Sequence, residues 1–102
     1  MADSGLLPIS LAAAVPLRIA EYIQMGGPSA LDVERARSQA HTLAEKGDVL
    51  LYRGKRPGEA ATLFNALADC LAIMAFCPGG VKVFGLHFQA EIPGMEGKYA
   101  PG

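Results

Sequence analysis

The 102-residue sequence has little charge, and neither sign is in excess. Charged residues make up 19% of it, with nine basic against ten acidic side chains, whereas an average soluble domain has about 25%. A dedicated nucleic-acid binder carries an excess of basic side chains, so the composition argues against that class of protein.

Cysteine is also scarce, with Cys70 and Cys77 as the only two. They fall in one expected helix, about 10.5 Å apart along its axis. This exceeds the Cα separation of about 7 Å that a disulfide tolerates. We therefore expect reduced thiols that serve as small core side chains, and a cytoplasmic protein. The alternative is a disulfide between a cysteine and its symmetry mate across a twofold axis.

A membrane span is missing too. The least charged stretch is residues 60–81, where Asp69 is the only charge. Asn65 and Asp69 would lie near the middle of a bilayer, and Pro78-Gly79-Gly80 would end the helix early. The amino terminus lacks the basic leading region of a signal peptide. No association with a membrane is expected.

The motifs of common active sites are absent as well. There is no serine, histidine and acid arrangement, no short metal-binding spacing, and no glycine-lysine-serine or threonine ending of a P-loop. The sequence therefore predicts no catalytic residues, no metal and no cofactor, and it favours a protein that is not an enzyme.

What is present is a surplus of apolar side chains, since 51% of the residues are hydrophobic. We expect one small domain, with a loose leader at 1–5 and an extended tail at 91–102. Pro8 and Pro16 predict a broken start, followed by a helix over 16–25 that Gly26 and Gly27 end. The side chains expected to be buried in this helix are Leu17, Ile19, Ala20 and Ile23.

Ser29 and Asp32 have the spacing of a capping box, and they predict a second helix that Gly47 ends. Its expected inner stripe is Val33, Ala36, Ala40 and Leu43. Residues 49–52 then read as a short buried strand.

Residues 57–76 predict a third helix that is apolar on most sides, and such a helix is normally enclosed. Residues 81–88 alternate like a second strand, and Gly85 predicts a bend in it. Strand, helix and strand in this order predict two parallel strands in a βαβ-like half. The expected fold is α+β, with three helices and a two-stranded sheet that self-association completes or covers.

The loop of residues 53–59 is the first candidate for a binding site. Arg53, Lys55 and Arg56 lie among glycines just before the third helix. The free N–H groups at a helix start favour anions, so a phosphate could bind there. An ordinary solvated turn is the competing interpretation.

Asp69 and His87 are the other candidates. A carboxylate in an apolar helix must be exposed, paired or protonated. We expect Asp69 to face solvent or to pair with Arg35, Arg37 or Lys82, unless it lies in a ligand pocket. His87 is expected to be a hydrogen-bonded core histidine, and a ligand role is the alternative.

The apolar surplus predicts a non-catalytic interaction or assembly module that forms a homo-oligomer or binds a protein partner. The residues expected at the interface are Leu63, Leu67, Cys70 and Met74 on the third helix. The alternative function is binding of a small anion or phosphate compound, with or without catalysis, by Arg53, Lys55 and Arg56 together with Asp69 or His87.

Overall fold

The computed structural model describes the backbone of residues 6–52 and 57–90, and it confirms the small α+β class. The elements are α1 (Leu6–Gln24), α2 (Ala30–Tyr52), α3 (Pro57–Met74), β1 (Val81–Val83) and β2 (Leu86–Phe88). The predicted leader and tail, at 1–5 and 91–102, lie outside the described residues.

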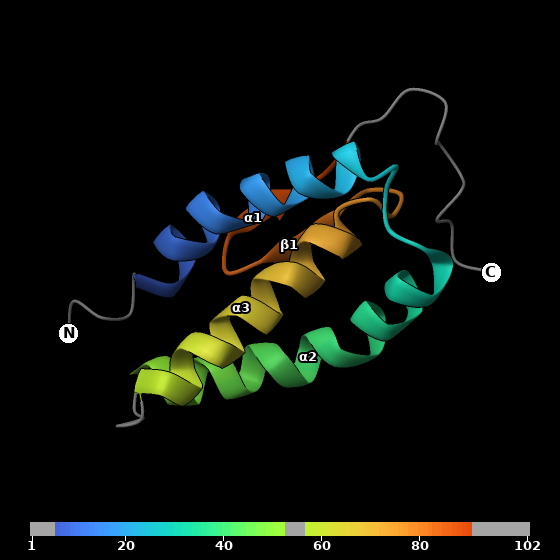
Figure 1. The fold of residues 1–102 in the computed structure, drawn as a ribbon. Helices are drawn as coiled ribbons and strands as arrows, with labels where there is room; N and C mark the ends of the chain where they lie inside the picture. Colours follow the sequence, from blue (N-terminus) through green and yellow to red (C-terminus); the bar gives the residue numbers. More distant parts are fainter. Residues whose placement is uncertain (1–5, 53–56, 91–102) are drawn as a thin grey trace.

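Helix α3 is the central element, with α1 on one side, α2 on another, and the hairpin against α1 and α3 (Figure 1). Helices α1 and α3 run in the same direction, because the residue numbers of their hydrogen-bonded pairs rise together. Arg18 pairs with Asn65, and one turn later Tyr22 pairs with Asp69. Helix α2 runs opposite to both (Figure 1).

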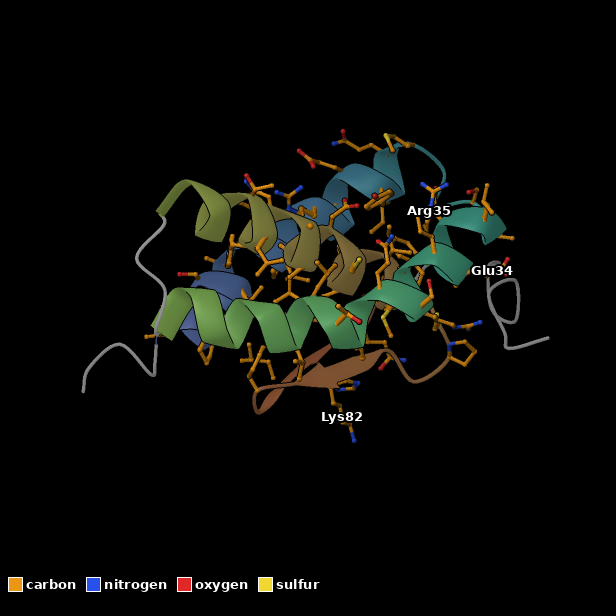
Figure 2. All side chains as sticks on the ribbon, turned by 90° about the horizontal axis from the view of Figure 1, so that it is seen from below. Glu34, Arg35 and Lys82 are labelled. Carbon is orange, nitrogen blue, oxygen red and sulfur yellow. The ribbon has the colours of Figure 1, made fainter. Side chains whose placement is uncertain are left out.

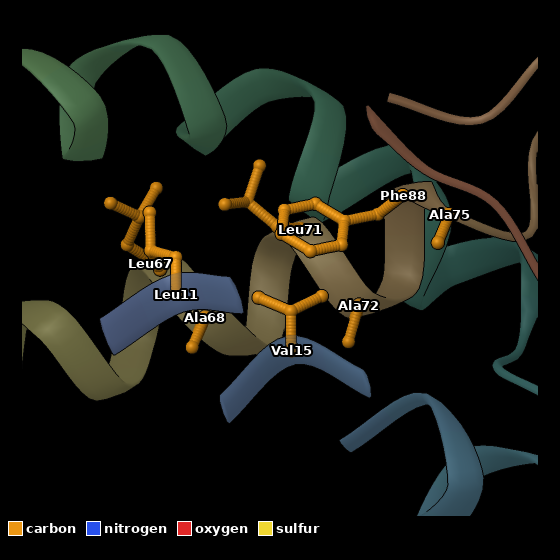
Figure 3. Close-up of a cluster of buried hydrophobic side chains, with 8 residues drawn as sticks. All are labelled: Leu11, Val15, Leu67, Ala68, Leu71, Ala72, Ala75 and Phe88. Atoms are coloured by element: carbon orange, nitrogen blue, oxygen red, sulfur yellow. The ribbon is translucent and has the colours of Figure 1, made fainter. Parts of the chain in front are cut away.

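Two groups of buried side chains explain why α3 is apolar on most sides. The first joins α1, α3 and β2 (Figure 3), and it contains Leu11, Val15, Leu67, Ala68, Leu71, Ala72, Ala75 and Phe88. The second joins α2 to the other side of α3, and it contains Val33, Ala36, Cys70, Ile73 and Phe76. The predicted enclosure of the third helix is thus confirmed from Leu67 to its end, whereas Ala61, Thr62, Asn65 and Ala66 are exposed. The helix ends at Met74, two residues before the predicted end.

Helix α1 is longer than predicted and buries a different face. It begins at Leu6 and continues through Pro16. Pro16 lies on the exposed side, where water can bond to the carbonyl that proline leaves without a donor. Leu11 and Val15 are buried instead of Leu17, which is 69% exposed. Of the other residues expected in the core, Ile19 is half-buried, whereas Ala20 and Ile23 are exposed.

The predicted glycine stop after α1 is confirmed. Gly26 has a φ of 88°, in the left-handed region that glycine adopts readily. The Gly27 N–H donates to the Tyr22 carbonyl at 2.7 Å, and the Gly26 N–H donates to that of Ile23. These bonds satisfy carbonyls of the last turn and let the chain reverse toward α2.

The capping box at the start of α2 is also confirmed. The Asp32 N–H donates to Ser29 Oγ at 3.0 Å, and the Ser29 N–H donates to Asp32 Oδ2 at 3.2 Å.

We predict that Ser29→Ala lowers the free energy of unfolding by about 1 kcal/mol, since an N–H of the first turn loses its acceptor. Urea unfolding measures the loss. Ser38→Ala, at an exposed site within α2, should change stability by less than about 0.5 kcal/mol, and an equal loss in both variants would contradict the cap.

The predicted strand at residues 49–52 is wrong, because α2 continues through Gly47 to Tyr52. A run of four apolar residues has no periodicity that separates a short strand from a helix. A glycine inside a helix costs only about 1 kcal/mol relative to alanine, which packing against another helix can offset. Helix α2 packs extensively along α3.

The single strand predicted at 81–88 is a hairpin, so the parallel βαβ arrangement is wrong. Strands β1 and β2 are antiparallel, with Val81 opposite Phe88 and Val83 opposite Leu86. Phe84 and Gly85 form the turn with φ values of 50° and 78°, as a two-residue hairpin turn of type I′ requires at both positions. Phenylalanine is an unusual choice for this backbone conformation, so the residue type gave no turn signal.

Candidate functional site

Four polar side chains cross the otherwise apolar contact between α1 and α3, and we call them the α1–α3 polar seam. Arg18 Nη2 donates to Asn65 Oδ1 at 2.9 Å, and the Tyr22 hydroxyl donates to Asp69 Oδ1 at 2.7 Å. In each helix the two residues lie four apart, so they occupy one face in successive turns. The seam therefore fixes how far α1 is shifted along α3.

The Tyr22 side chain connects this seam to the core. Its ring meets Phe76 edge to face, with centroids 6.3 Å apart. Burial raises the pKa of the Tyr22 phenol well above its usual value, and the hydrogen bond to Asp69 and that carboxylate's charge raise it further. A phenol that holds its proton this firmly is a hydrogen-bond donor over the physiological pH range and is a poor acid.

Asp69 thus has a partner that the sequence analysis did not name. We expected solvent or a cationic side chain, whereas the hydrogen bond comes from Tyr22 on α1. The side chain of Lys82 extends from β1 away from the helices (Figure 2). The sequence does contain a pattern that indicates this contact between α1 and α3. Arg18 and Tyr22 are spaced four apart in an apolar segment, as are Asn65 and Asp69.

His87 is hydrogen-bonded, as predicted, but it is not in the core. Its side chain is exposed on β2, and Nε2 lies 2.8 Å from the Gly79 carbonyl oxygen. Because a carbonyl only accepts, Nε2 must carry the proton in this contact. His87 therefore ties the hairpin to the turn that precedes it.

The two cysteines are free thiols in different surroundings. Cys70 is buried between α2 and α3, and burial raises its pKa, with a further rise from the nearby charge of Asp69. A thiol with a raised pKa is a weak nucleophile at neutral pH. Cys77 is half-buried, and Arg37 Nη2 donates toward its Sγ at 3.4 Å.

The remaining predicted site residues fall into two groups. Arg53, Lys55 and Arg56 lie outside the described residues, so the anion site at that loop stays a prediction. Of the four residues expected at an interface, Leu67 and Cys70 are buried inside the domain, and Leu63 and Met74 are half-buried.

A different surface has the properties expected of an interface. We call it the outward face of α1 and define it by five exposed residues: Ile9, Ala13, Pro16, Leu17 and Ala20. At 100° per residue they occupy an arc of about 100° on the side opposite Leu11 and Val15. Ile9 and Leu17 are each 69% exposed. This face was not predicted, because the helix expected over 16–25 places Leu17 and Ala20 in the core.

The described residues hold no cluster of three or more His, Cys, Asp or Glu side chains that could bind a metal ion. Within the same residues, no helix has the length and apolar character needed to cross a membrane. Comparison of the chain with protein-family models, curated proteins and solved structures finds no match. A functional proposal must therefore rest on the geometry of this molecule.

Proposed function

We propose that this protein is a non-catalytic assembly module that forms homo-oligomers through the outward face of α1. The observation that carries the proposal is this face, which is apolar and exposed although the same helix already buries its opposite side. A helix that is apolar on two opposite sides exposes one of them unless a partner covers it.

The energetics favour a partner for this face. Full burial of a leucine or isoleucine side chain contributes about 1.5 to 3 kcal/mol. Ile9 and Leu17 are both 69% exposed, and in a homodimer each contributes twice. This gain must exceed an association cost of at least about 4 kcal/mol. The helix is only about 28 Å long, and the net gain left after this cost is at most about 4 kcal/mol. We therefore expect a modest interface and a dissociation constant of about 1 mM.

The chemistry of the polar groups supports a non-catalytic role. In the seam, Asp69 accepts the bond from Tyr22, and the Tyr22 phenol holds its proton firmly. Burial keeps the Cys70 thiol protonated. The free state of both cysteines is what a reducing, cytoplasmic setting would maintain.

We predict that Leu17→Glu converts the oligomer to a monomer. Burying a carboxylate against an apolar partner surface is costly, while the same group on an exposed helix face is tolerated. Sedimentation velocity at about 1 mM chain, close to the expected dissociation constant, measures the change. Circular dichroism checks that the variant still folds.

Leu31→Glu provides the matched control, because Leu31 is 62% exposed at the start of α2. It makes the same substitution at a similar exposure on another helix, and it should leave the oligomer intact. A wild-type chain that sediments as a monomer would contradict the proposal, and so would a Leu17→Glu variant that associates as strongly as wild type.

A further inference from the structure

We infer that the outward face of α1 is covered by α1 of a second copy, antiparallel to the first, with the twofold axis passing beside Ala13. This inference rests on the proposed function and specifies the occupant and its orientation. Three features of the helix support it: the order of side-chain sizes along the face, the position of its charges, and the size of the residue at the centre.

The order of side chains is close to symmetrical about Ala13. Ile9 precedes it by four residues and Leu17 follows it by four, and both are 69% exposed. A twofold axis at Ala13 places Ile9 of one copy at the same level as Leu17 of the other. An interface between identical surfaces must be self-complementary in this way. Each large side chain then packs beside one from the second copy, on either side of a small centre.

The charges favour the antiparallel orientation over the parallel one. Glu21 is exposed at the edge of this face, and a parallel pair would bring the two Glu21 carboxylates together. The antiparallel pair separates their positions by about 24 Å along the axis. It also places each Glu21 near the first turn of the other α1, which contains no acidic residue of its own. A carboxylate is stabilised beside the free N–H groups of a helix start.

The small residue at the centre permits close contact. Helices pack with their axes about 8 to 10 Å apart, and each Cα lies about 2.3 Å from its own axis. The Ala13 Cα atoms of the two copies would then be separated by about 3.4 to 5.4 Å, within the reach of a disulfide. Ala20 lies on the same face, but its two copies would be about 21 Å apart along the axis.

Single cysteine substitutions at these two alanines test the orientation. After mild oxidation and non-reducing electrophoresis, Ala13→Cys should give at least about tenfold more covalent dimer than Ala20→Cys, because only position 13 meets its own copy. Both sites are exposed alanines in the same helix, so they are matched in folding and reactivity. The wild-type chain measures the background from Cys70 and Cys77.

The outcomes separate this inference from the proposed function. Equal cross-linking at positions 13 and 20 would indicate a parallel pair, and no cross-linking at position 13 would indicate another contact. Either result overturns the antiparallel arrangement, while dissociation by Leu17→Glu would still support assembly through α1. A wild-type chain that is monomeric at about 1 mM overturns both.

Discussion

Replacing Gly80 with alanine is expected to lower the free energy of unfolding by about 2 to 4 kcal/mol, the largest loss among the substitutions considered. Gly80 has a φ of 69°, which alanine adopts only with strain. A Cβ at this position would also collide with the Phe88 carbonyl oxygen and crowd the Gln89 backbone. Backbone atoms on both sides of the hairpin base would have to move apart.

The expected loss is large because the hairpin base is tied to the core. Phe88 is buried against α1 and α3, and just beyond it the Ala90 N–H donates to the Ala75 carbonyl at 2.8 Å. A shift of this segment weakens both contacts. Thermal unfolding provides the measurement, because each kcal/mol corresponds to a shift in Tm of about 4 to 8 °C for a domain of this size.

Gly79→Ala is the matched control for this prediction. Gly79 has a φ of 79°, but nothing lies within 4 Å of a Cβ built there. This variant therefore bears only the cost of the left-handed backbone, about 1 to 2 kcal/mol. The difference between the two variants isolates the steric conflict with Phe88. If both variants lose the same stability, the close approach at Gly80 is not what makes glycine necessary.

The second large effect is expected from Tyr22→Phe, which should cost about 1 to 2 kcal/mol at neutral pH. It removes the hydroxyl that donates to Asp69 at 2.7 Å and leaves a half-buried carboxylate without that donor. Hydrogen bonds to charged groups contribute about 1.5 to 3 kcal/mol, and the partial exposure of this pair reduces the figure. Urea unfolding measures the change.

The same variant should also flatten the dependence of stability on alkaline pH. Because the folded chain raises the pKa of Tyr22, it favours the neutral phenol. This contribution is complete below the unfolded pKa of about 10, and it is lost as the pH rises from there toward the folded value. In this pH range the free energy of unfolding of the wild type should fall more steeply than that of Tyr22→Phe. The two slopes should differ by at most about 1.4 kcal/mol per pH unit, and solvent screening reduces this difference.

Asp69→Asn is the control for the contribution of charge. An asparagine oxygen can still accept from the phenol, so we expect a smaller loss at neutral pH than in Tyr22→Phe. Burial is the largest cause of the raised pKa, so part of the alkaline effect should remain in this variant. If the free energies of unfolding of wild type and Tyr22→Phe changed in parallel between pH 9 and about 11, Tyr22 would not be the titrating group.

The seam and the outward face have linked roles in the proposed assembly. Arg18 and Tyr22 hold the inward side of α1 against α3, and this attachment presents Ile9 and Leu17 to the surroundings. Loss of the seam should therefore weaken self-association as well as folding, whereas Leu17→Glu should affect association alone. Comparing the two variants separates attachment of the helix from its use as an interface.

Local sequence signals determined several features of this protein without tertiary information. The reciprocal bonds of Ser29 and Asp32 start α2 where the sequence indicated, and Gly26 and Gly27 end α1. The run of apolar residues in α3 predicted an enclosed central helix. These features depend on hydrogen bonds and side chains within a few residues, so the local pattern contains the necessary information.

Other features depended on contacts between segments that are distant in the sequence. Helix α1 is apolar on two sides, so its own pattern cannot say which side α3 covers, and the core took Leu11 and Val15 rather than Leu17. The alternating residues at 81–88 fit one strand or two, and only the backbone reversal at Phe84 decided the hairpin.

The partner of Asp69 is the clearest case of tertiary control. A carboxylate in an apolar helix requires a donor or solvent, and the sequence by itself established that requirement. Which side chain supplies the donor depends on how α1 is shifted along α3, and Tyr22 lies 47 residues away. The sequence therefore determined the number of helices, the glycine stop and capping box between α1 and α2, and the need for a partner. Only the packing of α1 on α3 selected Tyr22 and left Ile9 and Leu17 exposed.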